Sequence, residues 1–383
     1  MRFQKRLFWC SLLFLLALLG VPLLLAGLHM QQEQRDQALI FAVQAQNGAA
    51  VRKLLQAGAS PNARVQNRPK RTFRQHRMNL FDTLRGRKPE DPAGSSALML
   101  AVVKDNTEIV LALLAQGAME VHSDADFSTD PAYPHRMPLL SGAARNGNRI
   151  IVQALLDRGA YIDTQGANGE TALIVAASEL PTYYTYREET KAPSEAACKT
   201  HTAVVRLLLD RGANVHARKF RGKYSDETAL ILAGRYNELD TIKLLLSRGA
   251  NVNEAAGGVT ALMLSALYGD PPTLRYLLRR GADVNARSDD GRTALMYAAE
   301  DGEDENIEVL LEAGANPNRT DAEGKTALMW AAEDGNDEAV RLLLEAGAKI
   351  NARDKSEQTA LGHAIAEDNT DVIRLLRKAG GKK

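Results

Sequence analysis

Cysteine and aromatic residues are scarce in this chain. Its 383 residues include two cysteines, Cys10 and Cys198, and only 5% of them are aromatic. Two cysteines exclude the disulfide framework that holds many small secreted domains together, so the fold must rely on packing. The formal net charge of +1 is the sum of local clusters of opposite sign, and it indicates no class of partner by itself.

Catalytic and metal-binding signatures are absent as well. The sequence has no Gly-rich phosphate loop and no G-x-S-x-G, H-E-x-x-H or C-x-x-C motif. Residues 122–135 share only the alternating Asp residues of a calcium loop, because Thr129 replaces the turn glycine and His135 the bidentate glutamate. Lys199 and His201 follow Cys198, but no further His or basic pattern indicates an activated thiol. We therefore expect no enzyme activity, no cofactor, no metal and no small-molecule substrate.

A ladder of glycines runs through the chain. Each glycine ends a leucine-rich segment such as LLDRG, LLSRG or LLEAG, and the positions are Gly58, Gly117, Gly159, Gly212, Gly249, Gly281, Gly314, Gly347 and Gly380. The last four are spaced by 33 residues, and the spacing is longer in the first half, where residues are inserted. A fixed period of this length is typical of repeat architectures.

One unit, residues 293–320, shows what each repeat builds. ALMYAAED is rich in helix formers, and Gly302 ends this first helix. A second helix follows, with apolar residues from Ile307 to Leu311 on one face and Gly314 in position to close it. Two helices this short cannot bury their apolar faces alone, but they can when they stack on neighbouring pairs.

The repeated residues T-A-L-M-x-A-A and L-L-x-x-G-A-x-x-N, with a glycine between the two helices, resemble the ankyrin repeat over roughly Gln37 to Gly380. The resemblance implies an all-α solenoid of about nine helix-turn-helix repeats with short hairpin turns, over residues 37–383. The chain has Met263, Met296 and Met329 where the family usually has a histidine that links neighbouring repeats by hydrogen bonds. We expect this methionine ladder to replace the polar link with apolar packing.

The amino terminus predicts a membrane segment. Basic residues in the cytoplasmic n-region 1–6 precede 22 uncharged residues from Leu7 to Leu28, enough to span a bilayer as one transmembrane helix. We interpret 7–28 as a signal anchor, and the alternative is a signal peptide cleaved after Ala26. The positive-inside rule then places the repeats on the exported side. In a bacterium this is a single-pass inner-membrane protein with periplasmic repeats, or a secreted or periplasmic protein after cleavage.

Insertions interrupt the repeats at about 62–93, 120–136, 179–200 and 217–226. The first contains nine Lys and Arg residues and three acids. It is either a solvated loop or a contact for anionic lipid or a partner, through Arg64, Arg68, Lys70, Arg71, Arg74 and Arg77. We expect no nucleic-acid binding, because the sequence contains no known reading module.

Acidic residues gather in the later repeats. From Asp289 to Glu345 the chain has sixteen acids and four bases. Acids at the end of a helix oppose its dipole, so solubility or partner binding explains them better than local stability. The resemblance implies that the finger turn and the end of the first helix contact partners. The candidate protein-binding residues are Asp289, Asp290, Glu300, Asp301, Glu323, Trp330, Glu333 and Asp334.

Within this set, Trp330 occupies the same place in its repeat as Tyr297 in the repeat before. We expect both rings to pack between repeats, and an aromatic anchor for a partner is the alternative. We also expect reversal of Glu300, Asp301, Glu333 and Asp334 to lysine to leave thermal unfolding nearly unchanged.

We therefore predict a protein-protein interaction scaffold or adaptor that binds a partner with a basic surface on the exported side of a membrane. The alternative is an inhibitor or immunity-type protein that blocks an exported enzyme or toxin. Tight one-to-one binding with loss of the target's activity would distinguish the second role from the first.

Overall fold

A computed structural model describes residues 21–65, 95–118, 124–126, 136–166, 168–178, 195–220, 226–236, 238–268 and 270–383. These residues form eighteen helices and six short strands. The chain divides into two compact units, Met1–Tyr161 and Ile162–Lys383. The helices come in pairs, with three pairs in the first unit and six in the second.

Each pair is one repeat. The pairs of the first unit are α2 (Val21–Gln44) with α3 (Gly48–Gln56), α5 (Ala97–Val103) with α6 (Thr107–Ala115), and α7 (Leu139–Arg145) with α8 (Arg149–Asp157). Those of the second unit are α9 (Ala172–Ser178) with α10 (Glu195–Asp210), α11 (Ala229–Arg235) with α12 (Leu239–Ser247), α13 (Ala261–Tyr268) with α14 (Pro271–Arg279), α15 (Ala294–Asp301) with α16 (Asp304–Glu312), α17 (Ala327–Asp334) with α18 (Asp337–Glu345), and α19 (Ala360–Ala366) with α20 (Thr370–Lys378).

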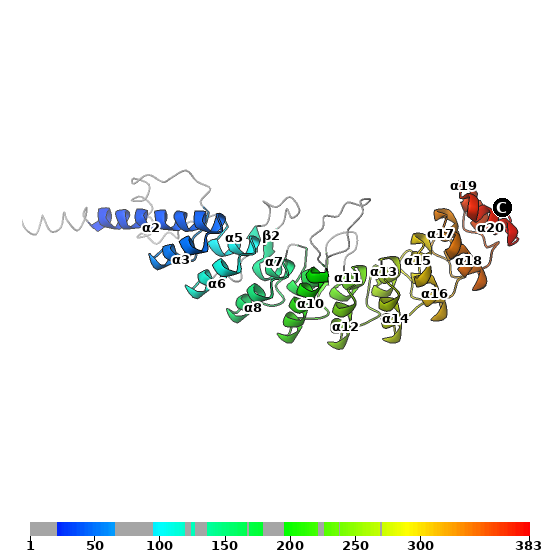
Figure 1. Cartoon of the computed structure of the whole chain (residues 1–383), viewed down its shortest axis with the longest axis horizontal. Coiled ribbons are helices and arrows are strands. Elements are labelled where there is room, and N and C mark those ends of the chain that lie inside the picture. The colour runs from blue at the N-terminus through cyan, green and yellow to red at the C-terminus, as the bar shows by residue number, and fades with distance from the viewer. Residues whose placement is uncertain are drawn as a thin grey trace, which may run out of the picture. The chain divides into compact units, whose positions relative to one another are not determined.

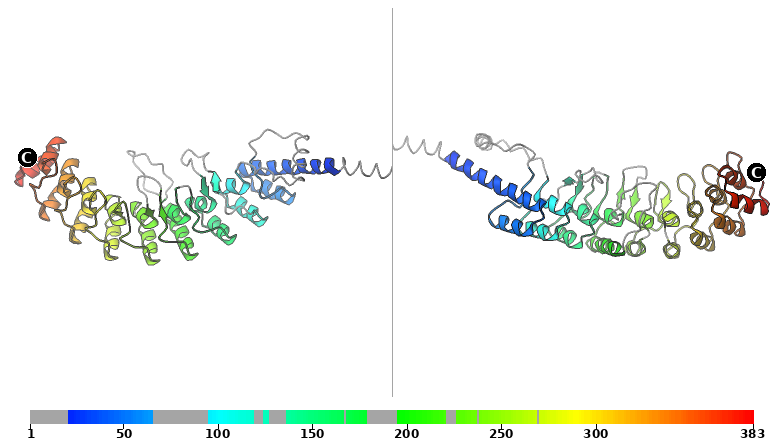
Figure 2. Two further views of the ribbon diagram at one scale, coloured as in Figure 1. Left: turned by 180° about the vertical axis from the view of Figure 1, so that it is seen from behind. Right: turned by 45° about the horizontal axis from the view of Figure 1, so that its top comes forward.

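Three two-stranded antiparallel hairpins precede first helices. They are β1 (Asp124–Asp126) with β2 (Arg136–Pro138), β3 (Arg218–Lys219) with β4 (Glu227–Thr228), and β5 (Ala255–Ala256) with β6 (Val259–Thr260). In the second unit the first helices α11, α13, α15, α17 and α19 follow one another in chain order, each with its second helix beside it (Figure 1). The same succession is visible from behind in Figure 2.

Glycines end the helices where the sequence predicts. Gly302 and Gly335 cap α15 and α17 in the left-handed conformation, with φ of 74° and 80°. Gly314, after α16, has a φ of 87°. A residue with a Cβ is strained in this region of backbone space, so the glycine ladder follows from the turns themselves.

The methionine ladder is part of the core, as predicted. Met263, Met296 and Met329 are each 1% exposed. Ala298 and Ala299 are fully buried and leave room for the first helix of the next repeat to approach. Packing between first helices is therefore apolar at the position where the family usually has its histidine.

A second ladder supplies the polar links between repeats, and it consists of asparagines. The amide nitrogen of Asn285 donates to the carbonyl of Gly314 (3.2 Å), and its oxygen accepts from the N–H of Asn316 (2.9 Å). Asn318 makes the same two bonds one repeat later, to the carbonyl of Gly347 (3.1 Å) and from the N–H of Lys349 (2.8 Å). Asn253 and Asn351 repeat the pattern. The last residue of G-A-x-x-N is thus a bridge to the following repeat.

Backbone hydrogen bonds join the finger turns, the turns that precede the first helices. The N–H of Asp289 donates to the carbonyl of Gly257 (3.0 Å), and the N–H of Ala322 donates to that of Asp290 (2.7 Å). At Gly291, where φ is 81°, a Cβ atom would lie 2.9 Å from the nitrogen of Ala322. Adjacent fingers therefore lie so close that this position requires glycine.

The structure differs from the sequence prediction at two boundaries. Helix α10 begins at Glu195, so the last residues of the predicted insertion 179–200 are helical. Helix α2 runs without a break from Val21 to Gln44, across the predicted end of the membrane segment at Leu28 and the predicted start of the repeats at Gln37. The two regions are therefore continuous, because no proline or glycine lies between Leu28 and Gln44 to end the helix.

Several predicted segments lie outside the described residues. They include residues 1–20, which hold most of the membrane segment, and a part of each of the four insertions. Within the described part of the chain, no helix is both long enough and apolar enough to cross a bilayer.

The asparagine ladder generates a stability prediction. We expect Asn318→Ala to lower the free energy of unfolding by about 1–2 kcal/mol, because two hydrogen bonds between repeats are lost. Glu312→Ala, an exposed change at the end of α16, is the control and should change it by less than about 0.5 kcal/mol. Urea unfolding followed by circular dichroism measures both. Equal effects of the two changes would contradict the assigned role of Asn318.

Candidate protein-binding surface

Most of the candidate acids lie on one surface of the second unit. This surface, the first-helix face, is formed by α15, α17 and α19 together with the finger turns that precede them. Residues 33 positions apart occupy equivalent places on it, so each side chain has a counterpart in the next repeat. Three sets of equivalent positions determine the geometry of this face. One set holds polar rings, one holds cations and one holds glutamates.

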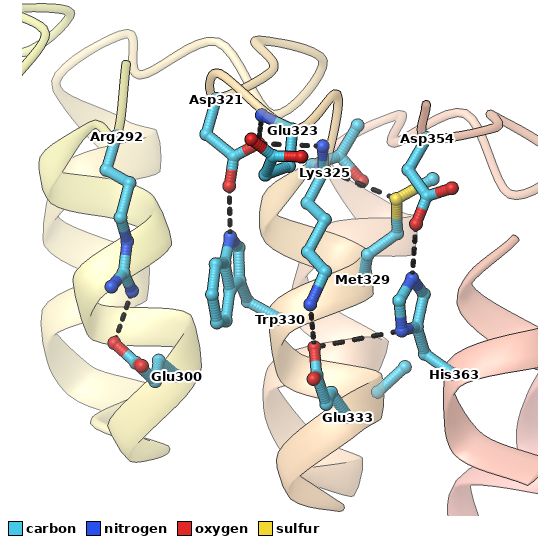
Figure 3. A network of polar contacts seen from close by, with 12 residues as sticks. Arg292, Glu300, Asp321, Glu323, Lys325, Met329, Trp330, Glu333, Asp354 and His363 are labelled. Carbon is cyan, nitrogen blue, oxygen red and sulfur yellow. Dashed lines mark hydrogen bonds and ion pairs between the residues drawn. The ribbon is translucent and has the colours of Figure 1, made fainter. Parts of the chain in front are cut away.

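Polar rings occupy the first place, in the middle of each first helix. The indole nitrogen of Trp330 donates to a carboxylate oxygen of Asp321 (3.0 Å), and Nε2 of His363 lies 2.7 Å from a carboxylate oxygen of Asp354 (Figure 3). Each acid stands nine residues before its ring, at the start of the finger turn. The turn and the helix of one repeat are therefore locked together by a buried or partly buried polar bond.

Cations occupy the second place and lie against these rings. The guanidinium carbon of Arg292 is 4.3 Å from the centroid of the Tyr297 ring and 4.2 Å from that of Trp330. The ammonium nitrogen of Lys325 is 4.4 Å from the Trp330 centroid. Arg292 belongs to repeat seven and Trp330 to repeat eight, so this cation–π contact crosses the repeat boundary.

Glutamates occupy the third place and pair with the cations. Glu300 forms an ion pair with Arg292, and Glu333 forms one with Lys325, in each case within one repeat. Both side chains are about one third exposed, at 33% and 30%. Glu333 also lies 3.7 Å from Nδ1 of His363 in the following repeat. These two acids therefore take part in the internal packing of the face.

Asp301 and Asp334 differ from the glutamates that precede them. Both are exposed at the ends of α15 and α17, and neither forms an ion pair within the described part of the chain. Partial burial and the charge of Glu300 raise the pKa of Asp301. Partial burial, Glu300 and Glu333 likewise raise the pKa of Asp334. In the folded protein the ionised form of both groups is therefore disfavoured.

The finger-tip acids form a second, separate group. Asp289, Asp290 and Glu323 are exposed, and their carbonyl or amide groups make the backbone bonds between fingers. The hydroxyl of Ser288 donates to the carboxylate of Asp290. The structure thus brings Glu300, Asp301, Trp330, Glu333 and Asp334 together along the helices, and it places the other three candidates at the tips.

Trp330 lies where the predicted packing role requires. Arg292 and Lys325 lie against its ring, and its only N–H is bonded to Asp321. His363, the equivalent residue one repeat later, is 9% exposed. An anchoring role for Trp330 toward a partner stays a prediction.

The predicted basic contacts are mostly outside the described residues. Arg68, Lys70, Arg71, Arg74 and Arg77 fall there. Arg64 is described and forms an antiparallel bridge with Ser96, at the base of the first insertion. Among the described residues no group of His, Cys, Asp or Glu is arranged to hold a metal ion.

Sequence reasoning missed the cations and the finger acids of this face. Arg292 and Lys325 are 33 residues apart, and each precedes its glutamate by eight residues. Asp321 and Asp354 repeat at the same spacing. A search for charged residues of either sign that recur in successive repeats would have found both the cations and the finger acids.

The cation–π contact generates a prediction. We expect Arg292→Met and Trp330→Leu to be non-additive, with a coupling of about 0.5–2 kcal/mol, because each change removes the same contact between repeats. Urea unfolding of the two single variants and the double variant measures the coupling. A second cycle that pairs Trp330→Leu with Arg248→Met, three repeats away, should be additive. Additivity in the first cycle would show that the stacking of Arg292 on Trp330 stabilises nothing.

Comparison with known proteins agrees with this architecture. A family model described as ankyrin repeats (3 copies) matches residues 98–186, 184–256, 251–321 and 317–383. An ankyrin repeat-containing protein of Treponema pallidum (strain Nichols) is 35% identical over 153 residues, which are 38% of this chain and 42% of that relative. The chain thus spans less than half the length of this curated relative. Because the family matches cover most of the sequence, the chain belongs to the ankyrin-repeat family.

Proposed function

We propose that this protein is a binding scaffold whose first-helix face holds a partner with a basic surface, and that Asp301 and Asp334 make the principal contacts. Proteins of this family generally act by binding other proteins. The observation that supports the proposal is that two acids of this face are ion-paired within the protein and two are not. Glu300 and Glu333 have internal cations as partners, whereas Asp301 and Asp334 are exposed and have none within the described part of the chain.

The two aspartates are unfavourable for the fold itself. Each has a raised pKa, so ionisation at neutral pH costs the folded state free energy relative to the unfolded state. Each also stands at the carboxyl end of a helix, where the helix dipole disfavours negative charge. A cationic side chain of a partner would remove both penalties, and this favours a binding role over one in solubility alone.

The structure revises the expected effect of reversing four acids at once. Lysine at 300 and 333 would lie against Arg292 and Lys325, which now have glutamate partners. Like charges at this distance would destabilise the repeats, so we now expect lysine at these two positions to lower the thermal unfolding temperature. Only Asp301 and Asp334 can be changed as a test of the surface.

The double change Asp301→Asn/Asp334→Asn therefore has two expected effects. It should raise the free energy of unfolding at pH 7, and the difference from the unchanged protein should shrink as pH falls, because the aspartates then become protonated. It should also reduce retention of basic partners at least tenfold. Urea unfolding between pH 4 and 7 tests the first effect, and crosslinking in intact cells followed by quantitative identification tests the second.

Glu308→Gln/Glu345→Gln is the matched control, with the same loss of charge on the second helices of the same two repeats. It should leave partner retention unchanged. If both double variants retain basic partners equally, the proposed surface is wrong. A captured partner that is an enzyme or toxin, bound one-to-one and inactive, would identify the scaffold as an inhibitor.

We further propose that the repeats are exported and anchored by the apolar amino terminus. The support is the uncharged run from Leu7 to Leu28, preceded by the basic residues of 1–6. In a bacterium, the anchor would lie in the inner membrane and the repeats in the periplasm.

Fusion of reporters after Lys383 tests this topology. Alkaline phosphatase, which is active only after export, should be active, and a fluorescent protein that matures only in the cytoplasm should be dark. A bright cytoplasmic reporter with inactive phosphatase is the opposite result, and it would overturn the proposed orientation.

A further inference from the structure

Helix α2 has two halves with different surroundings. Its carboxyl-terminal half is the first helix of repeat one, where Leu39 and Val43 are fully buried. In its amino-terminal half Leu24, Leu25 and Leu28 are exposed, at 65%, 41% and 54%. The helix continues from one half into the other without interruption (Figure 1).

Hydrogen bonds fasten the middle of α2 to the repeat. One carboxylate oxygen of Asp36 accepts from the N–H of Ser60 (2.7 Å) and from the amide of Gln32 (2.9 Å). The same amide of Gln32 donates to the carbonyl of Gly58 (2.9 Å). Gly58 and Ser60 lie in the turn that closes repeat one, so α2 is fixed to the repeat from Gln32 onward. A single helical turn separates Gln32 from Leu28.

The exposed leucines are the last part of a longer apolar run. No acidic or basic residue other than His29 occurs between Leu7 and Glu33. Soluble surfaces rarely leave so many neighbouring large apolar side chains in water. A run of this length suits the hydrocarbon of a bilayer, and the polar sequence QQEQRDQ begins directly after it.

We propose that the leucine-bearing end of α2 lies in a lipid bilayer and that α2 is a rigid connection that fixes repeat one at the membrane surface. This inference rests on the membrane anchoring proposed above. Gln37 lies nine positions after Leu28, so repeat one begins about 14 Å along the helix axis from the last exposed leucine. The segment is then retained, because cleavage after Ala26 would remove Leu24 and Leu25.

Spin labels on the full-length protein test the position of the leucines. Leu25→Cys, Leu28→Cys and Gln34→Cys are made one at a time on a Cys10→Ser/Cys198→Ser background and placed in vesicles of phosphatidylcholine and phosphatidylglycerol. Labels at 25 and 28 should be accessible to oxygen and at least fivefold protected from a water-soluble nickel complex. The label at 34 should show the reverse.

Distances between pairs of labels test the rigidity. The pair Leu28→Cys/Lys53→Cys joins α2 to the exposed face of α3 and should give one narrow distribution, as narrow as that of Gln34→Cys/Lys53→Cys. Three glycines inserted between Gln31 and Gln32 should broaden the first distribution and leave the second nearly unchanged. Urea unfolding of the insertion variant checks that repeat one remains folded.

The possible failures are separable. A chain that does not float with the vesicles refutes the anchoring proposal itself. A chain that floats while labels at 25 and 28 are open to nickel refutes only the position of α2, and a broad distribution for the pair 28 and 53 refutes its rigidity. A further outcome is that labels at position 28 on different chains broaden each other's spectra and are protected from both oxygen and nickel. That result would show that a second copy of the chain, and not lipid, covers the leucines.

Discussion

The register between repeats is the constraint on which the rest of the structure depends. A pair of helices seven to nine residues long has too little apolar surface to be stable alone, so each repeat needs a neighbour placed in one defined position. Three sets of contacts set that position in the second unit: methionine packing between first helices, asparagine bonds between the loops, and backbone bonds between fingers. Apolar packing supplies most of the stabilisation, and the polar contacts fix the alignment.

The same register decides which charges are available to a partner. Because equivalent residues come side by side, Arg292 lies between the rings of two repeats and Lys325 lies against the second ring. Each cation forms an ion pair with a glutamate of its own repeat. One row of acids is thereby satisfied within the molecule. The adjacent row, Asp301 and Asp334, forms no ion pair within the described part of the chain, and partial burial and the nearby glutamates raise the pKa of both groups. Two neighbouring residues in the sequence therefore have opposite roles, one structural and one facing outward.

Sequence alone was sufficient for the repeats, for their glycine-capped helices and for the buried methionines, because each is a local pattern that recurs with a fixed period. It was not sufficient for the pairing of Glu300 with Arg292, which depends on how the finger turn folds back over the helix. The continuity of α2 was also missed. Its signal was the lack of glycine and proline after Leu28, but the change from apolar to polar residues suggested a boundary. A change in hydropathy alters the surroundings of a helix without ending it.

The asparagine ladder has a direction, because its four side chains, at Asn253, Asn285, Asn318 and Asn351, all reach forward to the repeat that follows. Asn285 reaches Gly314, and Asn318 reaches Gly347, with the same offset. If one complete unit were lost during evolution, the remaining asparagine would meet an equivalent glycine in the new neighbour. Loss of one or two residues would misalign every partner beyond the site. Arrays of this kind can therefore gain or lose whole repeats readily. Their loops tolerate insertions and deletions only where no asparagine joins one repeat to the next.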